Sequence, residues 1–339
     1  MRKIINPRRS LFMLREDIFT DVYTPETIQE IQCITNNDGC IHKEEAILDS
    51  PENYKDVEIV FSGWGAPRLT DEFLNSLPSL KAIFYAAGTV KPFITNAFWE
   101  RDIILTSAFQ ANAIPVAEFT VATITLALKR AWYFNRLLIN GIDPKIKDHV
   151  IPGSYKGTRV GIISLGAIGY LVCEKLNQMD VDVLAYDPYV SEDVFNQLGV
   201  KRVDSLESIF EQSNVVSLHA PWLKETENMI TGELLQRLPQ DATFINTARP
   251  AIVNEPNLLE VLKQRPDIQA ILDVVDESDS IVHNPLNQMA NAFITPHIAG
   301  SMGRECHRMG AMALQECYRF LAGKPQLAPI SRMATSLIA

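Results

Sequence analysis

Two residues with complementary chemistry, Arg249 and His297, each follow a short apolar segment in the second half of the chain. Such segments are typical of strands buried on both faces of a parallel sheet. An arginine fork binds a carboxylate through paired hydrogen bonds, and a histidine exchanges a proton near neutral pH. Each residue also has a structural alternative: Arg249 could form a surface ion pair, and His297 could lie in a capped loop. Because parallel strands end at one edge of a sheet, we expect both side chains at one site that binds a small anion and moves a proton.

A turn with Ser164, Gly166 and Gly169 lies between an apolar segment and an amphipathic helical pattern. Gly166 lets the backbone approach a pyrophosphate at the helix N-terminus, and Gly169 lets helix and strand pack closely. A second apolar segment ends at Asp187, 18 residues after Gly169, where a carboxylate accepts hydrogen bonds from an adenosine ribose. This arrangement predicts a dinucleotide site.

Ser164 occupies the place of the first glycine in the G-x-G-x-x-G pattern, where a tight turn is needed. The alternative is an ordinary strand–turn–helix unit with Asp187 at the surface. The strand, the helix and the acid at the right distance together favour the dinucleotide. Asp187 also favours NAD over NADP, since it would repel a 2′-phosphate and no arginine follows within the next few residues.

Strands and helices alternate along the chain, which indicates an α/β fold with doubly wound parallel sheets. We expect one long helix from residue 112 to about residue 140, with Pro115 near its start. The apolar surface of this helix indicates that it crosses between domains and forms a subunit interface; the alternative is a helix wholly inside the core. In the first half we expect strands at residues 3–5, 57–61, 80–85 and 103–106 and a helix at 70–76. In the second half we expect strands at 215–218, 243–245, 268–275 and 293–294 and helices at 205–212, 231–238, 255–265 and 306–321.

The net charge, the cysteines and the lengths of the apolar runs indicate which partners and compartments to expect. The net charge of −10 disfavours nucleic acids and anionic membranes. The five cysteines are odd in number and lack metal-ligand spacing, so we expect reduced thiols, no metal and a cytoplasmic protein. We see no signal peptide and no apolar run of membrane-spanning length.

These motifs resemble the D-isomer-specific 2-hydroxyacid dehydrogenase family. The resemblance implies two Rossmann-like domains with a cleft between them: a discontinuous substrate domain, residues 1–111 and 301–339, and an NAD-binding domain, residues 112–300. It also implies a homodimer, an NAD cofactor, and a small 2-hydroxy or 2-keto acid as substrate. The similar segments are 112–118, 164–169, 186–188, 218–221 with Thr226 and Ile230, 246–249, 272–274 and 295–301.

Residue roles follow from the same resemblance. Arg249 and the backbone near Ala87 and Gly88 would hold the substrate carboxylate, and His297 would be the acid and base. Asp273 would fix the nicotinamide amide. The cofactor would be contacted by Ser164, Gly166, Ala167, Ile168, Gly169, Asp187, His219, Pro221, Thr226, Thr247, Ala248 and Gly300.

Three positions depart from the family pattern. A glutamate that pairs with the histidine is expected five positions after Asp273, but Ser278 stands there, with Glu277 beside it as a substitute and Asp279 on the other side. Without that carboxylate, we expect carbonyl reduction to fade at a lower pH. Pro250 replaces a usual glycine and should hold Arg249 extended. The family usually has an acidic residue after the glycine that corresponds to Gly88, and this chain lacks it. The substrate preference of a relative therefore does not predict the preference of this chain.

Ser278 and Pro250 support a second hypothesis, in which the chain binds NAD(H) as a sensor with little turnover. A Rossmann methyltransferase is a third, but it leaves Arg249, Asp273 and His297 without roles.

Overall fold

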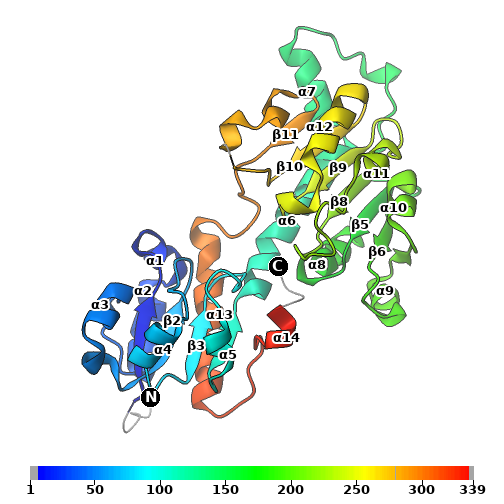
Figure 1. Ribbon diagram of the computed structural model, residues 1–339. Helices are drawn as coiled ribbons and strands as arrows, with labels where there is room; N and C mark the ends of the chain where they lie inside the picture. The colour runs from blue at the N-terminus through cyan, green and yellow to red at the C-terminus, as the bar shows by residue number, and fades with distance from the viewer. Residues whose placement is uncertain (1–6, 279, 336–339) are drawn as a thin grey trace. The chain divides into compact units, whose positions relative to one another are not determined.

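The computed structural model describes residues 7–278 and 280–335. The chain divides into two compact units (Figure 1). The terminal unit comprises Met1–Asn112 with Ser301–Ala339, and the central unit comprises Ala113–Gly300. Each unit is built on a parallel sheet, with four strands in the first and seven in the second. The predicted α/β class with two parallel sheets is confirmed.

The sheet of the terminal unit has the order β1-β2-β3-β4. Residues 36–41 add parallel bridges on the open side of β1, where Asn36 pairs with Arg9 and Ile41 with Phe12. The chain order therefore reverses at β1, and the crevice at the carboxyl end of such a strand is where open α/β sheets bind ligands. The strands are β1 (Arg9–Met13), β2 (Val57–Ser62), β3 (Ala82–Tyr85) and β4 (Ile104–Ser107).

Helix α13 (His307–Leu321) brings the C-terminal segment onto this sheet. Its buried face includes Met309, Ala313 and Cys317, and a side chain at Gly310 would lie 2.0 Å from the carbonyl oxygen of Val22. The other helices are α1 (Phe19–Val22), α2 (Pro25–Ile34), α3 (Glu44–Asp49), α4 (Asp71–Ser76), α5 (Asn96–Trp99) and α14 (Arg332–Thr335), with short 3-10 turns η1 (Glu16–Ile18), η2 (Pro51–Tyr54) and η7 (Gly303–Cys306).

The sheet of the central unit has the order β11-β10-β9-β8-β5-β6-β7, all parallel. The chain starts in the middle at β5, proceeds outward to β7, and returns to the other side at β8. The reversal between β5 and β8 makes their carboxyl ends the expected ligand site. The strands are β5 (Arg159–Ile163), β6 (Asp182–Tyr186), β7 (Lys201–Arg202), β8 (Val215–Leu218), β9 (Thr243–Asn246), β10 (Gln269–Leu272) and β11 (Ala292–Ile294).

Helices pack on both faces of this sheet and bury two apolar clusters against it. Side-chain caps begin three of them, since Ser205, Thr231 and Asn254 each accept a backbone N–H three residues later. The helices are α8 (Ala167–Leu176), α9 (Glu192–Leu198), α10 (Leu206–Gln212), α11 (Gly232–Gln236) and α12 (Glu255–Gln264), with 3-10 turns η3 (Ile146–Asp148), η4 (Pro250–Ile252), η5 (Ile281–His283) and η6 (Pro285–Gln288).

The prediction of one long helix from residue 112 to about residue 140 is wrong. The structure has α6 (Phe109–Leu128), with Pro115 inside it, and α7 (Ala131–Ile139). Arg130 separates them in a left-handed conformation with φ of 53°. Its guanidinium lies 2.6 Å from Asp241 and 4.2 Å from the centre of the Tyr133 ring, contacts that hold the chain in this bend.

Two further differences concern apolar segments. The expected strand at residues 3–5 lies outside the described residues, and the first strand is β1, which the sequence pattern missed. Helix α6 is long and apolar enough to span a membrane, contrary to the expectation that no such run exists. It is a core helix of this protein, with 56% of its most apolar window buried.

Candidate dinucleotide and catalytic site

The turn after β5 has the geometry that a pyrophosphate requires. A side chain at Gly169 would lie 2.0 Å from the carbonyl oxygen of Ser164, so only glycine allows α8 to pack against this turn. Gly166 caps α8, and a side chain there would meet no protein atom within 4 Å. Ala167 and Ile168 begin α8, and N–H groups in the first turn of a helix have no partner inside it. The turn therefore fits an anion at the positive end of α8.

Ser164 and Asp187 are joined at the ends of β5 and β6. Ser164 has a φ of 75°, a conformation that usually requires glycine. Oδ2 of Asp187 accepts hydrogen bonds from the Leu165 N–H at 2.8 Å and the Ser164 hydroxyl at 3.3 Å. Oδ1 accepts the Tyr189 N–H at 2.8 Å. A carboxylate has about four acceptor positions, so Asp187 keeps one on Oδ1 for a ligand hydroxyl.

His219 follows β8 and is bonded to β5 through its N–H and the Ile163 carbonyl. Its Nε2 lies 2.9 Å from the Ser217 hydroxyl, and its Nδ1 is buried with no hydrogen-bond partner among the described residues. Burial lowers the pKa of His219 to about 3, so the ring is neutral near pH 7. In the next loop the Thr226 hydroxyl donates to the Pro221 carbonyl at 2.6 Å. These residues shape the edge of the predicted cofactor site.

Arg249 follows β9 and is a partly buried cation without a counter-ion among residues 7–278 and 280–335. Its backbone is extended, with φ of −146° and ψ of 144°, as expected before Pro250. Its Nη1 donates to the Ala248 carbonyl at 2.7 Å, and the described part of the chain offers it no carboxylate. Burial lowers the pKa of the Arg249 guanidinium. Asn246 fixes the turn by accepting the Ala248 N–H and donating to the Arg249 carbonyl.

Asp273, directly after β10, organises the loop that carries His297. Its Oδ1 accepts the Thr295 hydroxyl at 2.6 Å and the Ile298 N–H at 2.9 Å, and its Oδ2 accepts the Ala299 N–H at 2.9 Å. The His297 ring is exposed, and no hydrogen bond to it occurs within residues 7–278 and 280–335. The ring is therefore accessible to a substrate proton, while Asp273 keeps one acceptor position on Oδ2.

The central unit places these predicted residues at one edge of its sheet. Gly166, Asp187, His219, Arg249, Asp273 and His297 follow β5, β6, β8, β9, β10 and β11, respectively. Thr247, also after β9, lies with its hydroxyl 3.2 Å from that of Thr120 on α6. Across the described ranges, no group of three or more His, Cys, Asp or Glu side chains could hold a metal.

Residues 122–299 match the model of the D-isomer specific 2-hydroxyacid dehydrogenase NAD-binding domain. The chain belongs to this family. Over 260 residues it is 30% identical to a glyoxylate reductase of Thermofilum pendens, covering 76% of each chain. It is also 30% identical over 254 residues to a D-3-phosphoglycerate dehydrogenase of Archaeoglobus fulgidus, covering 75% of this chain and 48% of the relative. The chain thus spans about half the length of that relative.

A solved structure shows the same fold. The apo form of D-mandelate dehydrogenase from Rhodotorula graminis superposes with a TM-score of 0.77 at 22% identity, over 96% of this chain and 98% of that one. By its match to the family model, the central unit is an NAD-binding domain of the 2-hydroxyacid dehydrogenase family.

Ser278, at the position of the family glutamate, is bonded elsewhere. Its hydroxyl donates to Oδ2 of Asp276 at 3.2 Å, and its N–H donates to Oδ1 at 3.0 Å. Glu277 is exposed, and Asp279 lies outside the described residues. Glu255 on α12 also holds this loop: it accepts the Asp276 N–H at 2.6 Å, and burial raises its pKa. The sequence pattern did not identify Glu255 or Asp276 as partners of this loop.

In the terminal unit, Ala87 and Gly88 form the turn after β3. Ser107 holds this turn by donating to the Ala87 carbonyl at 2.9 Å and the Gly88 carbonyl at 2.5 Å. A side chain at Gly88 would lie 3.8 Å from Nδ2 of Asn112, whose Oδ1 accepts the Ser301 N–H at 2.9 Å. Asn112 therefore presents a donor beside Gly88. In the sequence this asparagine stands out only as part of the 112–118 motif, because its contact with Gly88 joins residues 24 positions apart along the chain.

Proposed function

We propose that this protein is an NAD-dependent D-2-hydroxyacid dehydrogenase that interconverts a 2-hydroxy acid and the corresponding 2-keto acid. The observation that supports it most directly is Arg249, a partly buried cation at the carboxyl edge of a dinucleotide-binding sheet, for which the described residues provide no counter-ion. A substrate carboxylate would supply the missing charge through a bidentate pair.

His297 is the proposed acid and base. In reduction its protonated ring donates a proton to the oxygen at C2, and in oxidation its neutral ring takes that proton back. The nicotinamide, when bound, supplies or accepts the hydride. The Ala87–Gly88 turn of the terminal unit stays a predicted second contact for the substrate carboxylate, with Nδ2 of Asn112 as an additional donor.

We propose NAD rather than NADP because Asp187 would face a 2′-phosphate with a like charge. Asp187 is buried and fixed by three donors, so it cannot swing away at low cost. The turn at Gly166 would hold the pyrophosphate, and the remaining acceptor position of Asp273 would take the nicotinamide amide.

A panel of 2-keto acids that differ in side-chain size, assayed by loss of NADH absorbance, tests the activity. Arg249→Lys keeps the charge but loses the fork, and hydrogen bonds to charged groups contribute about 1.5–3 kcal/mol. We expect kcat/KM to fall roughly 10- to 100-fold, since about 1.4 kcal/mol is tenfold, with the Kd for NADH unchanged. Arg237→Lys, at an exposed ion pair with Glu211, is the matched control. Equal activity of the two variants would show that Arg249 does not bind the substrate.

The second candidate is an NAD(H)-binding sensor with little turnover. It is favoured by Ser278, whose hydroxyl is bonded to Asp276 and provides no charge. Tight NADH binding without turnover of any 2-keto acid in the panel would support the sensor over the enzyme.

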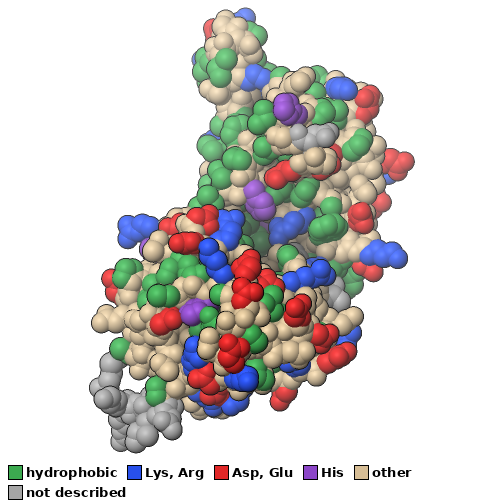
Figure 2. All heavy atoms as spheres, turned by 60° about the vertical axis from the view of Figure 1, so that its left-hand side comes forward, with side chains coloured by type: hydrophobic (Ala, Val, Ile, Leu, Met, Phe, Trp, Pro, Cys, Tyr) green, Lys and Arg blue, Asp and Glu red, His purple; other side chains and the backbone are tan. Residues whose placement is uncertain are grey.

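We also propose a homodimer formed through an apolar arm of the central unit, α7 with the following residues 140–155. The arm projects at the top of the molecule in Figures 1 and 2, where hydrophobic side chains reach the surface. Six large apolar residues on it are exposed: Leu138 (61%), Ile139 (76%), Ile142 (51%), Ile146 (56%), Val150 (76%) and Tyr155 (70%). Apolar surface gathered in one element is typical of a protein interface.

A further inference from the structure

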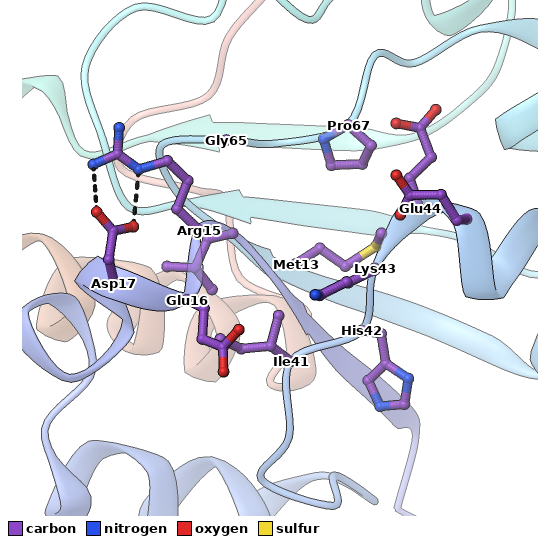
Figure 3. Close-up of a pocket in the computed structure, with 12 residues that line it drawn as sticks. Met13, Arg15, Glu16, Asp17, Ile41, His42, Lys43, Glu44, Gly65 and Pro67 are labelled. Atoms are coloured by element: carbon purple, nitrogen blue, oxygen red, sulfur yellow. Dashed lines mark hydrogen bonds and ion pairs between the residues drawn. The ribbon is translucent and has the colours of Figure 1, made fainter.

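Two places at the carboxyl edge of the terminal sheet differ in the groups that they present to a ligand. At the ends of β1 and β2 lies a pocket of about 450 Å³ (Figure 3). Its arginine, Arg15, already donates to both oxygens of Asp17 at 3.1 Å. The lining has four acidic side chains against one arginine, one lysine and one histidine. An anion would therefore meet net negative charge in this pocket.

The turn after β3 presents backbone N–H groups instead. Ala87 is buried in this turn, and Gly88 and Thr89 are half-buried. The N–H groups of Gly88 and Thr89 make no hydrogen bond to any described residue. Adjacent backbone N–H groups that point the same way bind anions. This turn is thus the part of the edge that suits a carboxylate.

Ser107, at the end of β4, orients these N–H groups from the opposite side of the turn. Its hydroxyl is shared between the Ala87 carbonyl at 2.9 Å and the Gly88 carbonyl at 2.5 Å. A trans peptide points its C=O and the following N–H in opposite directions, so the N–H groups of Gly88 and Thr89 point away from Ser107. The Ala87 carbonyl also accepts the Ala108 N–H at 3.0 Å, whereas the Gly88 carbonyl has no second partner among the described residues. Ser107 therefore controls the direction of the Thr89 N–H in particular.

The segment of residues 327–330, here called the edge segment, holds Ser107 in turn. It lies antiparallel beside β4. The Ser107 N–H donates to the Ala328 carbonyl at 3.3 Å, and the Ile330 N–H donates to the Leu105 carbonyl at 2.8 Å. Ala328 and Ile330 are buried. The position of Ser107 therefore depends on where the edge segment lies.

Glu316 on α13 anchors the edge segment. Its carboxylate accepts the Leu327 N–H at 3.0 Å through both oxygens and the Ala328 N–H at 2.7 Å through Oε1. Glu316 is only 1% exposed. Hydrogen bonds to an ionised acceptor are roughly twice as strong as those between neutral groups, so this carboxylate holds the edge segment firmly.

We propose that Ser107 and Glu316 are positioning residues for the substrate carboxylate. Glu316 fixes the edge segment on β4, the edge segment fixes Ser107, and Ser107 aims the N–H groups of Gly88 and Thr89 at the carboxylate. Both side chains are buried, so they act through the turn and not by contact with the substrate. This inference rests on the proposed dehydrogenase function, in which the turn at Gly88 contacts the substrate carboxylate.

Steady-state kinetics of Ser107→Ala, with the 2-keto acid of the panel that turns over best, test the first residue. The variant frees the Gly88 carbonyl, so the Thr89 N–H is no longer held toward the substrate. We expect KM to rise about tenfold while kcat and the Kd for NADH stay unchanged, because the carboxylate is bound equally in the ground and transition states. Ser10→Ala is the matched control: its buried hydroxyl on β1 also makes two hydrogen bonds, so it should lower Tm and leave KM unchanged.

Two variants of Glu316 separate positioning from general damage. Glu316→Ala removes the acceptors of the edge segment and should raise KM several-fold with kcat unchanged. Glu316→Gln keeps an oxygen for the same N–H groups, and its KM should stay within about twofold of wild type. In the Ser107→Ala background, Glu316→Ala should raise KM no further, because the turn on which it acts is already released.

An unchanged KM in Ser107→Ala, an equal rise in Ser10→Ala, or independent effects in the double variant overturns the inference and leaves the dehydrogenase function in place. If no 2-keto acid turns over, that function fails, and calorimetric titration of the NADH-loaded proteins with pyruvate replaces the KM measurement. Weaker binding of pyruvate by Ser107→Ala than by wild type then supports the positioning role, and equal or absent binding overturns it.

Discussion

The N–H of His297 donates a 2.9 Å hydrogen bond to the carbonyl oxygen of Asp273, and the carboxylate of Asp273 holds the two residues that follow His297. His297 has a φ of 56°, a left-handed conformation that costs a non-glycine residue about 1–3 kcal/mol. Such strain persists only where neighbouring contacts hold the backbone. Asp273 therefore determines where the proposed acid and base lies, in addition to its predicted contact with the cofactor.

Asp273→Asn should damage both stability and turnover. The new amide group would face the Ala299 N–H, donor against donor, at a residue that is 2% exposed. Such an unmade buried bond costs about 1–3 kcal/mol, and each kcal/mol lowers Tm by about 2–4 °C in a unit of this size. Thermal unfolding and kcat are the measurements. Asp180→Asn, at the surface of the same unit, is the control, and equal behaviour of the two variants would contradict this role.

Sequence patterns predicted the fold where the signal is local. The apolar segments of β5, β8, β9 and β10 are buried on both faces, so their composition alone identified them. The break at Arg130 was not predictable, because the helical period continues through it and no glycine marks it. Its cause is the ion pair with Asp241, 111 residues away.

For the site, too, the sequence predicted local motifs but did not predict the partners of individual side chains. The spacing of Gly166, Gly169 and Asp187 predicted a dinucleotide turn, and the family match confirms an NAD-binding domain. The partner of Ser278 could not be inferred, since Asp276 competes for its hydroxyl through a local turn that spacing does not reveal. The individual roles of Arg249 and His297 stay predictions.

Ser278→Glu should move the pH dependence of carbonyl reduction. Reduction needs protonated His297, and a nearby carboxylate stabilises the imidazolium. The pH at which reduction fades is therefore expected to rise, by roughly 1–3 units for a close pair. The pH–rate profile is the measurement, and Ser278→Gln is the control of equal size without charge. If the Glu and Gln variants share one profile, the proposed electrostatic effect is absent; a large loss in Glu277→Ala would instead show that Glu277 has taken the role.

His219 should make the protein less stable in acid. Unfolded histidine binds a proton near pH 6.5, whereas burial lowers the pKa of folded His219 to about 3. The unfolded state thus binds more protons below pH 6.5, and stability falls as pH drops from there toward 3. The loss is about 1.4 kcal/mol per pH unit at most, or roughly 2 kcal/mol between pH 6.5 and 5.

Urea unfolding at several pH values measures this contribution in wild type and His219→Gln. The variant should lose less stability between pH 6.5 and 5, while exposed His283→Gln should follow the wild type. Parallel curves for all three proteins would show that His219 does not carry the effect.

Charge on the apolar arm should disrupt the proposed homodimer. Leu138→Glu with Ile139→Glu places two carboxylates on side chains that are 61% and 76% exposed in the single chain. Light scattering should report twice 38.0 kDa for wild type and 38.0 kDa for the variant. Val282→Glu adds charge at another exposed apolar residue and should leave the dimer intact. A monomeric wild type, or a dimeric arm variant, would exclude this interface.

Ser164 should contribute to nucleotide choice through Asp187. Its hydroxyl is one of two donors to Oδ2, so its removal leaves the carboxylate less firmly placed for a ribose hydroxyl. Ser164→Ala keeps the φ of 75° and its strain but loses the donor, whereas Ser164→Gly loses the donor and relieves the strain. We therefore expect both variants to bind NADH several-fold more weakly, with NADPH affected less, and only Ser164→Ala to lower Tm.

Fluorescence titration with NADH and NADPH separates this role from a general distortion of the turn. In an Asp187→Asn background, Ser164→Ala should no longer change the ratio of the two Kd values, because the charge that the hydroxyl positions is gone. An equal loss of affinity for both nucleotides, or a change in ratio that persists without the Asp187 carboxylate, would show that Ser164 acts on the turn itself and not through Asp187.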